Sequence, residues 1–318
     1  IITRKNNRPE IERYMEKHQN LIHQNMEFKY HDLPYWAMFW KKKIGPRGYV
    51  LYFYLWQLLM PLFILKNKLE FDLCYNLNFH SDSTPHFLWV FAKPTIWGPI
   101  GHHPKMPLDY IRHYGNKVVN TDRKYALVKW IMRNLDPFFY LAKWKTDKII
   151  AINSSIKSTL RLKASKVEVI AAVAAEVPNL ISKENNVFNV LSVGRFTPMK
   201  GFDITILAFS KLIKALPTNK RDTVKLTLVG SGECKSYLNE LIKKHHIGGY
   251  VNIISWVERE EMDTIYNDAD VFLFPSHEGA GMVIPEAMSY GLPIICFDNV
   301  GPGELLKDAG VKITYTNY

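Results

Sequence analysis

The segment Phe274-Pro-Ser-His-Glu-Gly-Ala-Gly-Met-Val-Ile-Pro-Glu286 changes its character twice within thirteen residues. It begins at the end of an apolar run, residues 270–274, which is typical of a buried strand. Two glycines follow and indicate a loop. Pro285 suits the first position of a helix over 285–290, which Gly291 would end. The segment therefore predicts a strand, a tight loop and a helix.

The same segment predicts an anion site. Backbone N–H groups from Gly279 to Met282 and the positive end of the following helix both attract negative charge. Glu278 lies at the tip of the strand and Glu286 lies in the first helical turn, so two carboxylates flank the loop. Carboxylates accept hydrogen bonds from hydroxyl groups. An anion cradle between two such acceptors is the pattern we expect for a nucleotide sugar.

Around this segment, strand-like and helix-like stretches alternate regularly. Strands are expected at 187–193, 224–229, 251–254, 271–274 and 293–297, and helices at 202–215, 234–245, 259–267 and 285–290. Alternation at this spacing is typical of βαβ units and a doubly wound parallel sheet. The second half of the chain is therefore predicted to be one Rossmann-like domain.

The first half is less regular. Strands are expected at 71–75, 93–97, 148–152 and 167–170, and helices at 9–20, 125–141 and 154–162, the last capped by Ser154. The second strand leads into the loop Gly98-Pro-Ile-Gly-His-His-Pro104, at the sheet edge where ligands bind in open α/β folds. The polar segment 178–186 is the expected hinge, which gives domains at 1–180 and 181–318.

Charge is distributed unevenly between the halves. Residues 1–187 hold 28 Lys and Arg against 15 Asp and Glu, whereas residues 188–318 hold 13 against 15. The excess predicts an anionic partner for the first half, such as a phospholipid surface or a phosphate-bearing acceptor. A purely solubilising charge is the alternative. No recognition motif accompanies the charge, which argues against nucleic acid.

The apolar run Tyr49–Leu65 lies next to the basic cluster Lys41-Lys-Lys43 and has three interpretations. It is a buried core helix, a helix lying on a bilayer surface, or a short membrane span. Three widely spaced cysteines lack metal-ligand spacing and argue against a disulfide scaffold, as in a reducing compartment.

A second group of candidate residues follows the first strand of the Rossmann-like domain, in Val193-Gly-Arg-Phe-Thr-Pro-Met-Lys-Gly-Phe202. A glycine turn there precedes Arg195 and Lys200. A guanidinium can bind a diphosphate in a bidentate way, and an ammonium acts as a point charge. Taken alone, the turn is equally compatible with two surface cations. Val229-Gly-Ser-Gly232 is a second glycine turn at a strand end.

Together these motifs resemble the family-4 retaining glycosyltransferases (glycosyl transferases group 1), which have the GT-B fold of two Rossmann-like domains facing across a cleft. The resemblance covers residues 187–313 and rests on the two glycine turns, on Glu278-x7-Glu286, on Pro285–Pro293 and on Gly301-Pro-Gly-Glu304. It implies that the family's first strand and acceptor loop precede Ile1, and that its final helix follows Tyr318.

The resemblance implies roles for the matched residues. Arg195 and Lys200 would be catalytic by neutralising the leaving diphosphate, and Glu278 would hold the transferred sugar. The remaining matched positions would bind the donor nucleotide: Gly194, Gly230, Val257, Gly279, Ala280, Gly281, Met282 and Glu286. No metal is expected, because two cations already act on the diphosphate.

The loop Gly98–Pro104 resembles the place where family members position a His against the donor sugar. His102 or His103 could take this role, and His102 is preferred; a capping or solvent-exposed pair is the alternative. A carboxylate pair could also suggest a glycoside hydrolase. Its position beside a phosphate cradle with Arg and Lys favours transfer instead.

The predicted activity is transfer of a sugar from a UDP- or GDP-linked donor to a saccharide or lipid-linked acceptor, in polysaccharide biosynthesis. We expect no other cofactor, and a cytoplasmic protein that is peripheral to the membrane if the basic half binds lipid. A nucleotide-sugar epimerase, a phosphorylase-like enzyme of the same fold and a non-catalytic nucleotide-sugar-binding subunit are the alternatives.

Overall fold

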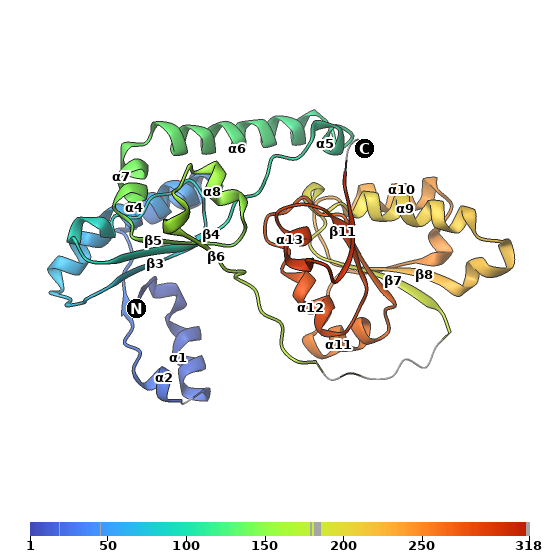
Figure 1. The fold of residues 1–318 in the computed structure, drawn as a ribbon, viewed down its shortest axis with the longest axis horizontal. Helices are drawn as coiled ribbons and strands as arrows, with labels where there is room; N and C mark the ends of the chain where they lie inside the picture. Colours follow the sequence, from blue (N-terminus) through green and yellow to red (C-terminus); the bar gives the residue numbers. More distant parts are fainter. Residues whose placement is uncertain (19, 45, 179, 181–185, 316–318) are drawn as a thin grey trace. The chain divides into compact units, whose positions relative to one another are not determined.

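The computed structural model describes residues 1–318 except 19, 45, 179, 181–185 and 316–318 (Figure 1). Most of the hinge expected at 178–186 lies outside the described residues. The chain forms two compact units. One comprises Ile1–Asn76, Ser83–Trp97 and Leu135–Asp147, and the other comprises Leu77–Asp82, Gly98–Asn134 and Lys148–Tyr318. The expected domain boundary near residue 180 stays a prediction.

The second unit contains a six-stranded sheet in the order β12-β11-β10-β7-β8-β9, and the strand pairs are parallel. The strands are β7 (Phe188–Val193), β8 (Val224–Val229), β9 (Val251–Ile254), β10 (Val271–Phe274), β11 (Ile294–Phe297) and β12 (Gly310–Ile313). The first five confirm the sequence prediction. The edge strand β12 was not predicted from the sequence, and its four residues are all exposed.

Helices α9 (Phe202–Ala215), α10 (Lys235–Lys244), α11 (Arg259–Asn267), α12 (Val283–Ser289) and α13 (Pro302–Leu306) connect these strands. Alternate strand residues face opposite sides of the sheet. Val190 therefore packs in the cluster that contains residues of α9 and α10, whereas Leu191 packs in the cluster that contains residues of α11, α12 and α13. Figure 1 shows helices on both faces of this sheet. The doubly wound parallel sheet is confirmed.

The beginning of α12 corrects one prediction. The helix begins at Val283, so Pro285 is its third residue and not its first. Proline is tolerated throughout the first turn, because the N–H groups there have no partner within the helix. Its presence therefore located the first turn without fixing the first residue.

A four-stranded sheet has the order β3-β4-β5-β6. Its strands are β3 (Cys74–His80), β4 (Thr95–Ile100), β5 (Lys148–Ala151) and β6 (Val167–Val169). The first two begin later than the predicted ranges. Three helices of this half are α6 (Asn116–Leu135), α7 (Pro137–Lys145) and α8 (Ser155–Thr159).

The single helix predicted over 125–141 is two helices, α6 and α7. The break lies at Asp136, which caps α7 by accepting a hydrogen bond from the Phe138 N–H at 2.9 Å. Pro137 follows at the first helical position, where its ring is tolerated. The sequence Asp-Pro is therefore a helix start inside a stretch of continuous apolar spacing.

The N-terminal elements are β1 (Ile2–Thr3), α1 (Arg8–Lys17), α2 (Leu21–Gln24), β2 (Lys29–Tyr30), α3 (Tyr35–Ile44) and α4 (Pro46–Lys66), and α5 (Leu108–Arg112) precedes α6. Within α4, the 19 residues Gly48–Lys66 are long and apolar enough to cross a membrane by length and composition. One third of the most apolar window is buried, including Met60 and Ile64. A buried core helix passes the same test, so the three interpretations of this helix stay open.

The three cysteines are free thiols, and each is buried. Burial raises the pKa of the Cys234 thiol to about 12 and that of Cys296 to about 11, and it also raises the pKa of Cys74. The expectation that this chain is not a disulfide scaffold stays a prediction.

Candidate active site

The two glycine turns meet at the carboxyl edge of the six-stranded sheet. The Gly194 N–H donates to the Val229 carbonyl at 2.9 Å. A Cβ atom at Gly230 would lie 1.9 Å from the Gly194 oxygen, so only glycine permits this approach. The predicted nucleotide-binding positions Gly194 and Gly230 are therefore in contact.

The turn before α9 packs against the segment that follows β10. Gly201 has φ +69°, and a Cβ atom there would lie 2.1 Å from the Pro275 oxygen. The Met199 carbonyl accepts hydrogen bonds from the His277 N–H at 2.8 Å and the Ser276 hydroxyl at 3.1 Å. These contacts hold Lys200 beside the loop that carries Glu278.

Lys200 and Glu278, predicted from separate motifs, form an ion pair. Lys200 Nζ lies 2.6 Å from Glu278 Oε2, and the side chains are only 16% and 8% exposed. The ammonium also lies 5.1 Å from the centre of the Phe274 ring, a favourable cation–π distance. The second carboxylate oxygen, Oε1, is buried without a hydrogen-bond partner among the described residues. Buried carboxylate oxygens usually have a partner from the protein, from a water molecule or from a ligand.

Arg195 lies apart from this pair. Its side chain is exposed, and its Nη2 atom is 3.9 Å from Glu233 Oε2. This distance is too long for a hydrogen bond, and such surface pairs contribute little stability. The guanidinium is therefore accessible to solvent, which suits a group that binds an incoming phosphate.

Glu286 has a phenol as its partner. The Tyr266 hydroxyl donates to Glu286 Oε2 at 3.1 Å, and the Tyr266 ring stacks on Tyr290 with centroids 4.7 Å apart. Burial, together with the Glu286 charge, raises the pKa of Tyr266, so the phenol keeps its proton and remains a donor. Tyr266 was not predicted as a site residue, because a tyrosine within a helix is normally expected to pack in the hydrophobic core.

The remaining predicted nucleotide-binding positions differ in exposure. Ala280 is half-buried, Gly281 is buried with φ +70°, and the Met282 side chain is 59% exposed. Val257 packs partly against the apolar cluster of α11 and α12. Their roles in donor binding stay predictions.

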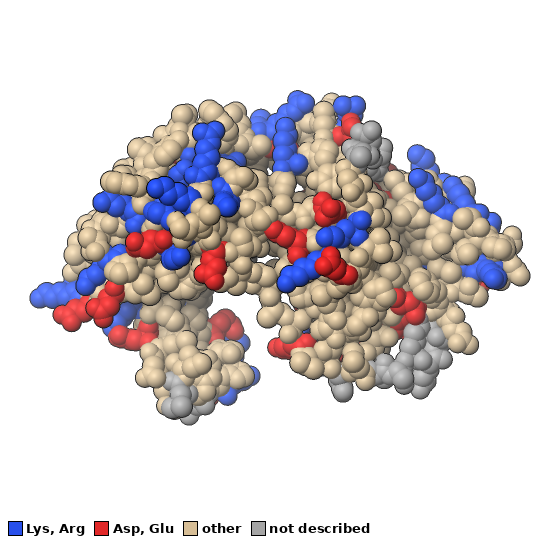
Figure 2. All heavy atoms as spheres, viewed as in Figure 1, with Lys and Arg blue, Asp and Glu red and all other residues tan. Residues whose placement is uncertain are grey.

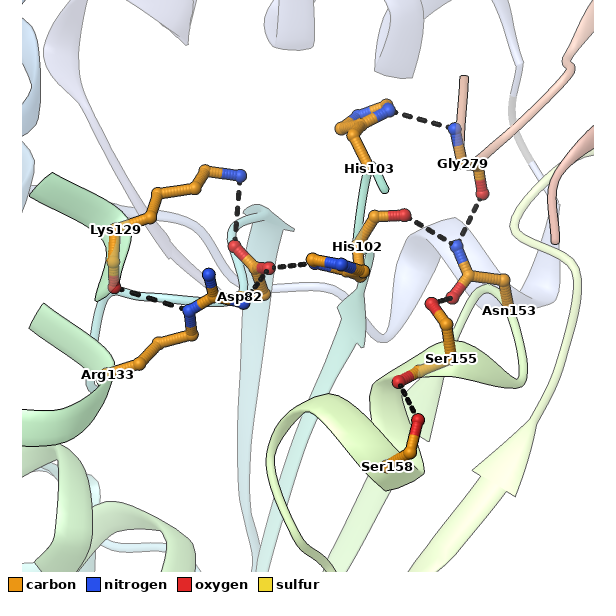
Figure 3. A network of polar contacts seen from close by, with 9 residues as sticks. All are labelled: Asp82, His102, His103, Lys129, Arg133, Asn153, Ser155, Ser158 and Gly279. Carbon is orange, nitrogen blue, oxygen red and sulfur yellow. Dashed lines mark hydrogen bonds and ion pairs between the residues drawn. The ribbon is translucent and has the colours of Figure 1, made fainter. Parts of the chain in front are cut away.

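The loop after β4 contacts the loop after β10 (Figure 3). The Gly279 N–H donates to His103 Nδ1 at 2.9 Å, and the Gly279 carbonyl accepts from Asn153 Nδ2 at 2.6 Å. The same amide nitrogen donates to the His102 carbonyl at 2.9 Å. A Cβ atom at Gly279 would lie 1.8 Å from that carbonyl. One of the N–H groups expected to bind phosphate is therefore bonded to an imidazole.

His102 contacts a buried carboxylate (Figure 3). Its Nδ1 atom lies 2.6 Å from Oδ2 of Asp82, which is fully buried. Lys129 Nζ lies 3.0 Å from Asp82 Oδ1, and Arg133 Nη1 lies 3.2 Å from Oδ2. Burial alone would raise the pKa of Asp82. The hydrogen bond from His102 and the charges of the two cations outweigh it and lower that pKa to about 2.

Four residues of this cluster were not predicted from the sequence: Asp82, Asn153, Lys129 and Arg133. Asn153 follows β5 directly, and this position at the carboxyl edge of a strand was an available signal. The predicted capping role of Ser154 is wrong, since its side chain makes no capping hydrogen bond. Its N–H instead donates to the Glu304 carboxylate, 3.1 Å from Oε1 and 3.0 Å from Oε2.

Within the described ranges, no three His, Cys, Asp or Glu side chains gather as a metal site would require. That observation concerns protein ligands alone, and a metal held mainly by a donor diphosphate would not need such a cluster. Metal independence stays a prediction.

Comparison with known proteins shows a family resemblance in the second half of the chain. Residues 176–318 match the family model described as glycosyl transferases group 1. The chain is 34% identical over 144 residues to the amylovoran biosynthesis glycosyltransferase AmsD of Erwinia amylovora, covering 43% of this chain and 38% of that protein. It is 24% identical over 255 residues to O-antigen chain mannosyltransferase B of Escherichia coli, covering 79% and 59%. The chain thus spans less than two thirds of the length of these relatives.

Solved structures agree on the fold. The apo lipopolysaccharide outer core galactosyltransferase WaaB superposes with a TM-score of 0.52 at 16% identity, covering 92% of this chain and 71% of that one. At this identity the likeness concerns the fold alone. Residues 176–318 are therefore similar to the glycosyl transferases group 1 family, and the fold of the chain is GT-B.

Proposed function

We propose that the chain transfers a sugar from a nucleotide diphosphate donor to a saccharide or lipid-linked acceptor in polysaccharide assembly. The Lys200–Glu278 pair carries the proposal, because it places a cation and an unsatisfied hydroxyl acceptor side by side. The printed functions of AmsD and of mannosyltransferase B, in amylovoran and O-antigen synthesis, support the choice of product.

The charges fit departure of a nucleotide diphosphate. Its negative charge grows as the bond to the sugar breaks, and fixed cations stabilise that charge. Lys200 supplies one cation beside the sugar, and the exposed Arg195 can bind the diphosphate with two parallel N–H groups. Neutralisation makes the diphosphate a good leaving group, so a strong general acid is unnecessary and no metal is required.

Two carboxylates would bind the sugar and the ribose of the donor. Glu278 Oε1 would accept a hydrogen bond from a hydroxyl of the transferred sugar, and Glu286, oriented by Tyr266, would hold the ribose. We assign a UDP- or GDP-linked donor and retention of stereochemistry at the transferred carbon, on the strength of the family motifs.

The experiment is incubation of the full chain with a panel of UDP- and GDP-sugars, followed by release of the nucleotide diphosphate. Lys200→Ala and Glu278→Gln should each lower release, by at least about tenfold for loss of one charge-stabilising contact. Lys211→Ala, which removes an exposed lysine of α9, is the matched control and should behave as wild type. Equal rates for all four proteins would refute the assignment.

The products separate the alternatives. An isomerised sugar still attached to its nucleotide would identify an epimerase. Donor binding without turnover, with every acceptor class tested, would identify a binding subunit.

We further propose that this enzyme binds an anionic membrane surface through α6. This helix carries three exposed basic residues, Lys117, Arg123 and Lys124, against one acidic residue, and only Val119 is fully buried. Leu127 and Ile131 are four positions apart, so they share one helix face, and both are exposed. Tyr125 and Trp130 are exposed as well. Figure 2 shows Lys and Arg side chains along the upper part of the view, where Figure 1 draws α6.

Exposed aromatic and aliphatic side chains interleaved with cations are typical of helices that lie at a lipid interface. Flotation with anionic vesicles tests this, and the double change Arg123→Glu with Lys124→Glu should release the protein. The matched control is Lys243→Glu with Lys244→Glu on α10, where both lysines are exposed. If both double variants are released from the vesicles equally, vesicle binding depends only on the net charge of the protein and not on α6.

A further inference from the structure

Asp82 is surrounded by three nitrogen groups. His102, Lys129 and Arg133 all contact its carboxylate, and the carboxylate itself is inaccessible to solvent. A buried carboxylate is costly unless it is paired, and here two permanent cations already exceed its single charge. An ionised carboxylate only accepts hydrogen bonds, so the His102 ring donates its Nδ1–H to Asp82.

A neutral imidazole has one N–H donor and one acceptor nitrogen. Because an ionised carboxylate can only accept, the proton of His102 must lie on Nδ1, and Nε2 is then the acceptor. The neighbouring His103 has the opposite arrangement. Its Nδ1 accepts from the Gly279 N–H, so its proton lies on Nε2. Burial lowers the pKa of His103 to about 4, which keeps this ring neutral at pH 7.

Hydrogen bonds hold the main chain of His102 beside the proposed donor site. Asn153, itself buried, donates both to the His102 carbonyl and to the carbonyl of Gly279, the residue after Glu278. Ser155 Oγ in turn donates to Asn153 Oδ1 at 2.8 Å, which fixes the orientation of that amide. The main chain of His102 is thereby held against the loop that carries Glu278 (Figure 3).

We propose that Asp82 is a positioning residue, which fixes His102 with its proton on Nδ1 so that Nε2 accepts a hydrogen bond from a donor-sugar hydroxyl. The inference rests on the proposed function for the identity of the ligand. Its structural part, the position of the proton, does not depend on any activity. A carboxylate that holds one nitrogen of a functional imidazole commonly sets the tautomer in this way.

The first test is nitrogen-15 NMR of the full chain labelled at histidine, with the His102 signals identified from His102→Gln. We expect the protonated nitrogen of His102 to be Nδ1 and that of His103 to be Nε2, so the adjacent ring is an internal reference. In Asp82→Ala, His102 should change to the Nε2–H form that free imidazole side chains prefer. A wild-type His102 protonated on Nε2, or an unchanged pattern in Asp82→Ala, would overturn the proposal.

Asp82→Asn separates positioning from charge balance. His102 and Arg133 both meet the Oδ2 position, so an amide oxygen placed there keeps the His102 contact while the carboxylate charge is lost. The Nδ1–H form should persist in this variant. If Asp82 only neutralised Lys129 and Arg133, the asparagine variant would disturb His102 as much as alanine does. If Asp82→Ala does not fold, the wild-type and Asp82→Asn spectra are enough to test the proposal.

The second test is a double-mutant cycle on nucleotide diphosphate release. Asp82→Ala should lower kcat/KM about 10- to 100-fold, as loss of such an orienting carboxylate does at metal-bound histidines. In a His102→Ala background it should add less than about twofold, because the group through which it acts is gone. An equal loss in both backgrounds would overturn the proposal. Absence of turnover in wild type would refute the proposed function instead, and the NMR result would still decide the role of Asp82.

Discussion

Gly201 offers a test of how the turn before α9 positions Lys200. Alanine at this position meets two obstacles, a backbone φ of +69° and the Pro275 oxygen 2.1 Å from the new Cβ. Gly291, after α12, is a matched control. Its φ is +70°, and nothing lies within 4 Å of a Cβ atom built there. Gly291→Ala therefore measures the backbone strain alone, and the difference between the two variants measures the close approach.

The magnitude follows from the distances. A left-handed backbone costs a non-glycine residue about 1–2 kcal/mol, which both variants should lose. In Gly201→Ala, the Pro275 oxygen must also withdraw by about 1 Å to reach a tolerable contact. A shift of that size would lengthen the 2.6 Å Lys200–Glu278 pair beyond hydrogen-bond range. Breaking a largely buried pair costs about 3 kcal/mol more.

Thermal unfolding of the two variants is the measurement. At about 3 °C per kcal/mol, Gly291→Ala should lower Tm by about 5 °C and Gly201→Ala by about 12 °C or more. Only Gly201→Ala should also lower nucleotide diphosphate release, because only it displaces Lys200. Equal Tm losses, or a Gly201→Ala enzyme with wild-type turnover, would refute the idea that this contact holds the ammonium in place.

Three further results are expected. Gly279→Ala would put a Cβ atom 1.8 Å from the His102 carbonyl, so it should abolish donor turnover while far-UV circular dichroism stays unchanged; retained turnover would contradict the loop contact. Asp82→Asn should cost about 2 kcal/mol at pH 6. In the folded protein the pKa of Asp82 is about 2, below the value near 4 in the unfolded chain, so the carboxylate stabilises the fold above pH 4. The difference in unfolding free energy between variant and wild type should therefore disappear as pH falls from about 4 to 2. A gap independent of pH would exclude the ionised carboxylate as its cause. Tyr266→Phe removes a 3.1 Å hydrogen bond to Glu286 and should weaken nucleotide binding by calorimetry at a stability cost of about 2 kcal/mol, whereas unaltered affinity would separate Glu286 from the ribose.

The second half of the chain was predictable because its signals are local. Strands β8, β9 and β10 have the bounds expected from apolar runs, and α9 begins and ends at the expected residues. Parallel strands buried on both faces are continuous apolar runs between glycine turns. Lys200 and Glu278 were likewise predicted from the two turns, and the shared sheet edge brings them together.

The contacts around His102 were not predictable, since they join residues far apart in sequence. Asp82 lies 20 positions before His102, and Asn153 lies 126 positions before Gly279. Hydrogen bonds between side chains and distant backbone leave no periodic trace in a sequence. Asp82 also follows β3, whose bounds differ from the prediction, so its place at a strand end was hidden as well.

The three buried thiols should react slowly with thiol-directed probes. Thiol-directed probes react with the thiolate at an accessible site, and all three native cysteines are enclosed and hold their protons. A cysteine introduced at an exposed position, for example in place of Tyr125 on α6, would then be the preferred target for a fluorophore. The native sequence can thus serve directly for single-site labelling, with no prior removal of cysteines that pack in the cores.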